Sequence, residues 1–148
     1  MPDLVRNKKA FHDYHVQETF EAGIELQGTE VKSCRAGNAS LDEAYVRPER
    51  RELFLVDAHI APYDKAAGAE NHDPRRPRRL LMHRSEIRRL AQNVDAKGLT
   101  LVPLRLYLTH GLIKLQVGLC KGKQKGDKRD DMRKKQSDRE LRNLSGRR

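Results

Sequence analysis

The chain has 148 residues, enough for one domain of ordinary size, and a formal net charge of +10 at pH 7. It holds no run of about 18 apolar residues, which excludes a typical membrane-spanning helix, and its first ten residues lack the apolar segment of a secretory signal. We therefore expect a soluble, cytoplasmic protein with no membrane partner. Cys34 and Cys120 lie far apart and match no metal-ligand spacing, so both are expected to stay reduced.

The positive charge is concentrated in two segments. Residues 74–89 hold seven Arg against one acid, and residues 121–148 hold twelve Lys or Arg against five acids, whereas the remaining residues sum to −3. A protein charged only for solubility would spread its basic residues more evenly. This segregation predicts binding to a polyanion, with nucleic acid as the favoured class.

Strand-like alternation dominates the first 120 residues. Gly111 is expected in a hairpin turn between the last two strands, and Pro103 at an edge or a bulge. Six short strands in about 110 residues predict a mainly β fold, a small closed or nearly closed barrel. The expected strands are residues 13–19, 23–27, 42–47, 52–60, 99–108 and 113–119.

Two helices are expected between the strands. The first spans residues 30–36, with Thr29 as its N-cap. The second spans about residues 84–96, where apolar residues recur at helical spacing, and Gly98 ends it. Residues 61–79 contain three Pro and few apolar residues, so we expect a long loop there.

The chain is expected to divide into a folded domain, residues 1–120, and a basic tail, residues 121–148. The tail contains only three apolar side chains, too few to offset the entropy lost on folding. Acidic residues precede basic ones at i, i+4 spacing within it, as at Asp130 and Lys134, which favours a helix. We therefore expect a tail that is disordered alone and becomes helical on a partner surface.

The sequence supplies little for catalysis or for metal and cofactor binding. No serine lies in a nucleophile-elbow context, no glycine-rich phosphate loop precedes a helix, and the six His show no ligand spacing. His12 and His15 are expected on one strand, facing opposite sides. We therefore expect no enzyme, no metal and no cofactor. Binding groups are better represented, because Arg75, Arg76, Arg78 and Arg79 carry guanidinium forks suited to phosphate.

Seven groups of residues stand out in chain order beyond what composition explains. They are NKKA (7–10) with HDY (12–14), FEAG (20–23), GTEVKSCRAG (28–37), DPR (73–75) through LL (80–81), KGLTLVPL (97–104), KGK (121–123) and DKR (127–129). These strings resemble the small protein B family, whose members bind transfer-messenger RNA, also called SsrA RNA. The resemblance covers nearly the whole chain.

The resemblance implies an oligonucleotide-binding-type barrel with flanking helices that binds the tRNA-like part of transfer-messenger RNA. The protein would stand in for the anticodon arm, and the pair would enter a ribosome stalled on a message without a stop codon. The ribosome, chiefly its small subunit and ribosomal RNA, is then a partner, and the elongation factor carrying the aminoacylated RNA is an indirect one. The tail would become helical in the empty message channel.

Family members use positions that match Glu21, Leu81 and Lys114 for RNA contact. A carboxylate at position 21 is open to two roles, accepting from a base edge or ordering a neighbouring Arg. With the arginines and the basic or aromatic residues of the matching strings, the predicted RNA-binding set is Lys8, His12, Tyr14, Glu21, Lys32, Arg35, Arg75, Arg76, Arg78, Leu81, Lys114, Lys121 and Lys123. The tail residues predicted at the decoding centre and in the message channel are Asp127, Lys128, Arg129, Arg133 and Lys134. Gly126 stands where the family commonly has His or Tyr, so this chain offers no stacking side chain there.

Two alternatives stay open. One is a general barrel-fold nucleic-acid binder, such as an initiation-factor-like or single-strand-binding protein. The other is a small RNA-processing nuclease that uses His12, Asp13 and His15. A rescue factor should select a folded tRNA-like domain over single strands and leave the RNA uncut.

Overall fold

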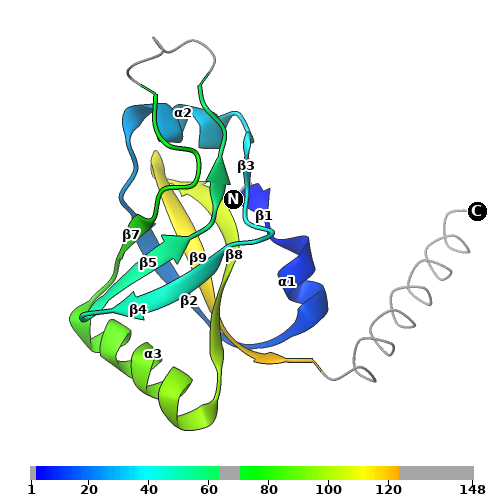
Figure 1. The fold of residues 1–148 in the computed structure, drawn as a ribbon, viewed down its shortest axis with the longest axis vertical. Coiled ribbons are helices and arrows are strands. Elements are labelled where there is room, and N and C mark those ends of the chain that lie inside the picture. The colour runs from blue at the N-terminus through cyan, green and yellow to red at the C-terminus, as the bar shows by residue number, and fades with distance from the viewer. Residues whose placement is uncertain (1–2, 64–70, 124–148) are drawn as a thin grey trace, which may run out of the picture.

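The computed structural model describes residues 3–63 and 71–123, in which three helices surround an antiparallel sheet (Figure 1). The sheet has seven strands in the order β1-β8-β9-β2-β7-β5-β4. Their bounds are β1 Asp3–Arg6, β2 Tyr14–Ile24, β4 Tyr45–Glu49, β5 Glu52–Val56, β7 Arg78–Leu81, β8 Thr100–Thr109 and β9 Leu112–Gly122. A second, small sheet pairs β3 (Ala39–Ser40) with β6 (His59–Ile60). The helices are α1 (Lys8–Asp13), α2 (Gly28–Arg35) and α3 (Arg84–Lys97).

The large sheet curls around the larger of two hydrophobic clusters in the described residues. Its hydrogen-bonded order is open, with β1 and β4 at its ends, but β4 packs against β8, the neighbour of β1. Leu53 and Leu55 of β5, Leu115 and Val117 of β9 and Leu90 of α3 are fully buried inside the curl. The predicted mainly β class is confirmed, and the curled, open sheet is compatible with an oligonucleotide-binding-type barrel.

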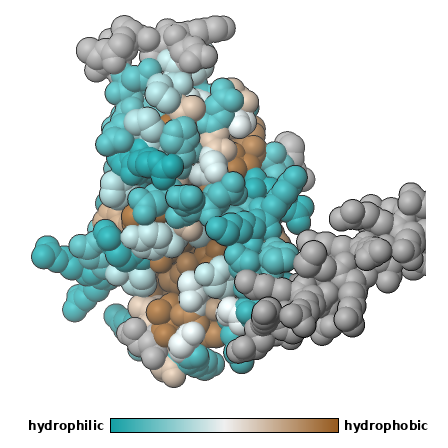
Figure 2. Space-filling model, turned by 45° about the vertical axis from the view of Figure 1, so that its right-hand side comes forward, coloured by the Kyte–Doolittle hydropathy of each residue, from teal (hydrophilic) through white to brown (hydrophobic). Residues whose placement is uncertain are grey.

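The helices cover separate edges of this sheet. In Figure 1, α2 and α3 lie at opposite ends of the molecule and α1 lies to one side, beside β8. Among the described residues, none of the helices is long and apolar enough to cross a membrane. Figure 2 shows one face on which hydrophilic side chains predominate, with hydrophobic surface gathered in its lower half.

Nine strands are present in the described residues where six were predicted. β2 is one strand rather than two, because its alternation stays in register with β9 from Thr19 to Gly23. The predicted strand at 52–60 divides into β5 and β6, with Asp57 at a φ of 61° between them. β1, β3 and β7 were not predicted. β7 begins inside the predicted loop 61–79, and it was missed because its two inward-facing residues are an arginine and Leu80, which do not form an apolar alternation.

The helices differ from the prediction in one additional helix and in the start of α2. α1 was not predicted, so His12 lies on a helix and His15 on β2, and the prediction that the two share a strand is wrong. α2 begins at Gly28 with Gln27 as its N-cap, two residues before the predicted Thr29. α3 matches its predicted range closely, and Gly98 ends it in the left-handed conformation at a φ of 62°.

Two turn predictions are confirmed. The β8–β9 register shifts between Pro103 and Arg105, which places the predicted bulge at the proline. Thr109 pairs with Leu112 across the hairpin, so Gly111 occupies a two-residue turn at a φ of 76°.

Gly118 on β9 provides a prediction about core packing. A Cβ at this position would lie 2.8 Å from Cδ1 of Leu104 and 3.0 Å from Sγ of Cys120, and both of those side chains are fully buried. We expect Gly118→Ala to lower the free energy of unfolding by about 1–3 kcal/mol, because the core must shift to admit a methyl group. Urea denaturation measures the change, and Gly122→Ala, where nothing lies within 4 Å of the added Cβ, is the control.

Candidate RNA-binding surface

The outer face of the large sheet brings Glu21, Leu81 and Lys114 together. Gly23 of β2 lies in register between Lys114 of β9 and Leu81 of β7. Glu21 precedes Gly23 by two residues and so shares its face, because side chains alternate along a strand. Leu81 is 47% exposed, and a Cβ on Gly23 would lie only 3.2 Å from that of Leu81, so glycine keeps the apolar side chain accessible. An acid, a base and an exposed apolar group therefore form one continuous surface.

Tyr107 holds the Glu21 carboxylate in place. The Tyr107 hydroxyl donates a 2.6 Å hydrogen bond to Oε2 of Glu21. Arg105 lies over the Tyr107 ring, 4.3 Å from its centroid, and donates from Nε to Oε1 of Gln116 at 3.1 Å. Burial and the Glu21 carboxylate both raise the pKa of Tyr107, so its hydroxyl remains a donor. Within the described residues Glu21 is ordered by a tyrosine, which leaves its exposed carboxylate positioned to accept from a ligand.

The three arginines of the predicted RNA-binding set lie in different environments. Arg78 is fully buried, with Nε and Nη2 bonded to Oε2 of Glu30 at 2.7 and 2.6 Å and Nη1 donating to the Ala58 carbonyl at 2.7 Å. It has no exposed surface to offer a phosphate, contrary to its place in the predicted set. Arg76 is 27% exposed and bonds the other Glu30 oxygen at 2.5 Å. Arg75 is exposed, and no described side chain forms an ion pair with it.

Glu30 is the buried anion that organises this region. Burial alone would raise its pKa, but hydrogen bonds from Arg76, the Gln27 backbone N–H and Arg78 outweigh burial and lower the pKa. The same carboxylate accepts from Gln27 N at 2.8 Å and so also caps α2. Sequence reasoning placed Glu30 only at the start of a helix, because the arginines that pair with it lie more than forty positions away.

A second group of predicted residues lies at the other end of β2. Lys8 and His12 are on α1, and Tyr14 pairs with Gly122 across β2 and β9, next to Lys121. Lys123 extends this end, donating from Nζ to the Phe11 carbonyl at 3.2 Å. The strand between Tyr14 and Gly23 is about 30 Å long, so this group is separate from the Glu21 surface.

Asn7 fixes α1 beside this second group, and sequence reasoning missed it. Its side-chain oxygen accepts from Ala10 N at 3.1 Å and caps the helix. Its amide nitrogen donates to the carbonyls of Pro103 and Leu41 at 2.8 and 3.3 Å. The residue is 3% exposed. An Asn before two lysines is a local signal for a cap, but its two long-range partners leave no mark in the sequence.

The remaining predicted residues lie on α2, close to the arginine group. Lys32 and Arg35 are both exposed, and Nζ of Lys32 lies 5.3 Å from the centre of the Tyr63 ring. His72 was also missed: its buried ring bonds Thr29 Oγ1 and the Ile60 carbonyl, both at 2.8 Å, and so ties α2 to β6. Lys32 and Arg35 therefore stand on a well-anchored helix.

The other predictions fall on different parts of the chain. Gly126 and the predicted tail residues, Asp127, Lys128, Arg129, Arg133 and Lys134, lie outside the described residues. Within the described ranges, no three His, Cys, Asp or Glu side chains group as metal ligands. Cys34 and Cys120 are buried free thiols, and burial raises the pKa of each to about 11. Of the residues in the nuclease alternative, His12 Nδ1 contacts Asp13 Oδ1 at 3.1 Å, while His15 lies opposite Lys121.

Comparison with known proteins identifies the family. The sequence model of the SmpB protein family matches residues 4–146. An SsrA-binding protein of Anoxybacillus flavithermus is 50% identical over 93% of this chain and 89% of its own length. One from Symbiobacterium thermophilum is 52% identical over 97% of this chain and 92% of its own length. A solved structure described as "tmRNA-SmpB: a journey to the center of the bacterial ribosome" has 50% identity and a TM-score of 0.68, covering 81% of this chain and 84% of that one. With the family model and both relatives spanning nearly its whole length, the chain belongs to the SmpB family.

Proposed function

We propose that this chain binds transfer-messenger RNA and carries it to stalled ribosomes, acting in the cytoplasm by binding alone. The observation that carries the proposal is the meeting of Glu21, Leu81 and Lys114 on one surface of an SmpB-family fold. Its relatives bear the name SsrA-binding protein, and the similar structure pairs SmpB with tmRNA and the bacterial ribosome. The predicted nucleic-acid class and the predicted family agree with both.

Each residue of the surface has a distinct chemical use against RNA. The Lys114 ammonium suits a phosphate, and the exposed Leu81 side chain offers apolar contact to a base or ribose that is out of the helical stack. Glu21, held by Tyr107, accepts hydrogen bonds and so suits a base amino group or a 2′-hydroxyl. Three different contacts on a fixed scaffold favour a folded RNA over an arbitrary single strand.

The proposal assigns the basic tail to the ribosome. The body, up to the end of β9, would hold the RNA, and the tail that follows Lys123 would enter the empty message channel, with Asp127, Lys128 and Arg129 near the decoding centre. The second group on α1 and at the end of β9 lies beside the point where the tail begins. Lys8, Lys121 and Lys123 would then bind RNA at this junction, where the contacts of the protein pass from transfer-messenger RNA to the RNA of the ribosome.

Replacement of Lys114 tests the RNA surface. We expect Lys114→Ala to weaken binding of the tRNA-like domain by about tenfold and to reduce the slope of log affinity against log salt by about 0.7–0.9, because the variant neutralises one phosphate fewer. Lys97 is an exposed lysine at the end of α3, so Lys97→Ala serves as the control. It should change the affinity and the slope only by the small amount that the loss of one distant positive charge causes. Fluorescence anisotropy with labelled RNA measures both.

The same assay separates the alternatives. A rescue factor should prefer the tRNA-like domain over a single strand of equal length, and the RNA should remain intact on a denaturing gel. Equal affinity for the two RNAs would favour a general nucleic-acid binder, and cleavage would favour the nuclease. If Lys114→Ala binds the RNA as tightly as the wild type, the RNA-binding surface must lie on another face of the protein.

A further inference from the structure

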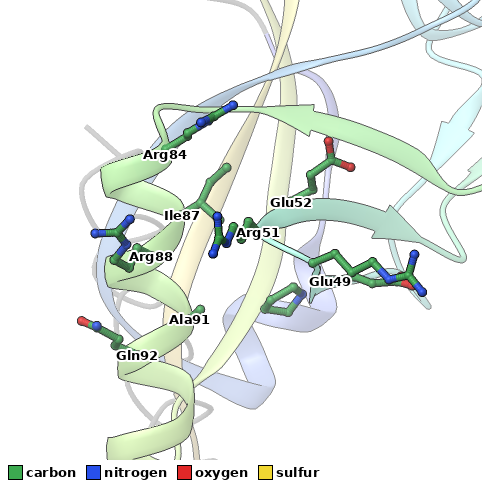
Figure 3. Close-up of a pocket in the computed structure, with 10 residues that line it drawn as sticks. Glu49, Arg51, Glu52, Arg84, Ile87, Arg88, Ala91 and Gln92 are labelled. Atoms are coloured by element: carbon green, nitrogen blue, oxygen red, sulfur yellow. The ribbon is translucent and has the colours of Figure 1, made fainter.

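Four arginines line a groove between the β4–β5 turn and α3. Pro48, Ile87 and Ala91 form its apolar floor, and its volume is about 580 Å³. Figure 3 shows Arg51 extending from the turn toward α3, where Arg84 and Arg88 lie one helical turn apart. The lining arginines are Arg50, Arg51, Arg84 and Arg88.

The arginines of the groove are not used to hold the fold together. No described side chain forms an ion pair with any of the four. The two acids in the groove are engaged by arginines outside it: Arg47 contacts Glu49 at 3.1 Å, and Arg79 contacts Glu52 at 3.4 Å. The groove therefore presents free guanidinium groups, while its carboxylates are already partly neutralised.

The turn that carries two of these arginines has residue types that do not suit its backbone conformation. Glu49 pairs with Glu52, so Arg50 and Arg51 form a two-residue hairpin loop, and both have positive φ, 47° and 68°. Loops of this kind strongly favour Asn-Gly or Asp-Gly, because a β-carbon is strained in the left-handed region. The chain keeps two arginines here although Asn-Gly would relieve the strain, which indicates that the arginine side chains have a function.

The groove is continuous with the candidate RNA-binding surface. A neighbouring hollow of about 320 Å³ shares Arg50, Arg51 and Arg84 with it and is also lined by Arg79 and Leu81. Leu81 belongs to the Glu21 surface, so a ligand lying over Leu81 has a basic path from β7 toward α3. The path ends near Gln92, along the groove.

We propose that this groove binds the phosphate backbone of the RNA strand that lies over Leu81, extending the contact toward α3. Guanidinium forks match phosphate oxygens, and the Glu49, Glu52 and Gln92 side chains can accept hydrogen bonds from ribose 2′-hydroxyls. RNA is favoured over an acidic peptide because the groove is continuous with the Leu81 surface that we assign to RNA. The proposal rests on the proposed function, since it lengthens the footprint of the same RNA.

Arg50→Asn with Arg51→Gly is the informative variant, because it installs the favoured turn pair while removing both charges. We expect its melting temperature to equal or exceed that of the wild type, whereas its affinity for the tRNA-like domain falls about tenfold or more at low salt. The log–log salt slope should fall by about 0.7–0.9 for each phosphate that the variant no longer neutralises. A structural role for these arginines would move stability and binding in the same direction. Arg84→Gln with Arg88→Gln should reproduce the weaker binding from the opposite wall.

Lys9→Gln with Lys97→Gln is the matched control, since it removes two exposed charges that lie outside the groove. Hydroxyl-radical footprinting of the RNA should show weaker protection in the groove variants at nucleotides next to, and distinct from, those that Lys114→Ala exposes. If both groove variants bind, respond to salt and protect the RNA as the control does, the proposal is overturned. Failure of the proposed function would look different, because the wild-type protein itself would then fail to prefer the tRNA-like domain.

Discussion

Glu30→Gln is expected to lower the free energy of unfolding by about 3–5 kcal/mol. The substitution leaves Arg78 charged and 0% exposed, without the carboxylate that bonds it at 2.7 and 2.6 Å. It also removes the charged acceptor of the Arg76 bonds. Urea denaturation followed by circular dichroism measures the change. Glu18→Gln is the matched control, because its ion pair with Arg89 is exposed and is expected to contribute less than about 1 kcal/mol.

The pH dependence of stability should carry the same signature. The folded protein lowers the pKa of Glu30, so its stabilisation is present above the ordinary pKa of a glutamate and is lost as pH falls through the lowered value. Wild-type protein should therefore lose stability steeply on acidification, and Glu30→Gln should lose less over the same interval. A variant that stays within about 1 kcal/mol of wild type at pH 7 would contradict the assigned role of Glu30.

Local patterns were enough to predict the elements whose burial follows a simple period. β9 alternates from Leu112 to Val117 and pairs with β8 around Gly111, and α3 has an apolar stripe and a glycine at its end. The family resemblance supplied Glu21, Leu81 and Lys114. Their meeting follows from strand register, which places Gly23 between β7 and β9.

The errors arose where long-range contacts override local pattern. Arg78 reads as a surface phosphate ligand in a basic run, but Glu30, 48 positions away, draws it into the core. α1 has six residues, too few for an independent helix, and it forms because Asn7 bonds the carbonyls of Leu41 and Pro103. Neither contact changes the hydrophobic period, so neither is visible without the fold.

Removal of residues 124–148 is expected to abolish tagging of stalled chains while leaving binding of the tRNA-like domain largely intact. The cut falls after Lys123 because β9 runs to Gly122, which pairs with Tyr14, and the Lys123 backbone N–H donates to the Asp13 carbonyl at 2.9 Å. A cut after Cys120, at the predicted domain end, would remove these contacts and confuse damage to the fold with damage to function.

The physical reason for the divided effect is the location of the charge. The removed segment holds ten Lys or Arg and five acids, so it takes a net +5 from the protein. The Glu21 surface and its neighbouring groove lie wholly within the described residues and keep every side chain that we assign to the RNA. Affinity for the tRNA-like domain should therefore fall only by the amount that the lost nonspecific attraction of the tail contributed. The slope of log affinity against log salt should become shallower for the same reason.

A reconstituted translation system stalled on a message without a stop codon measures the tagging rate, and anisotropy measures RNA affinity in parallel. The control keeps the tail but replaces Arg147 and Arg148 with Gln, since these two residues lie beyond the segment with helix-favouring pairs. That control should tag at the wild-type rate. Full tagging by the truncated protein would show that the body alone engages the ribosome, and the basic tail would then need another explanation. A fall in RNA affinity together with tagging would instead place part of the RNA-binding surface in the tail, against the division at the end of β9.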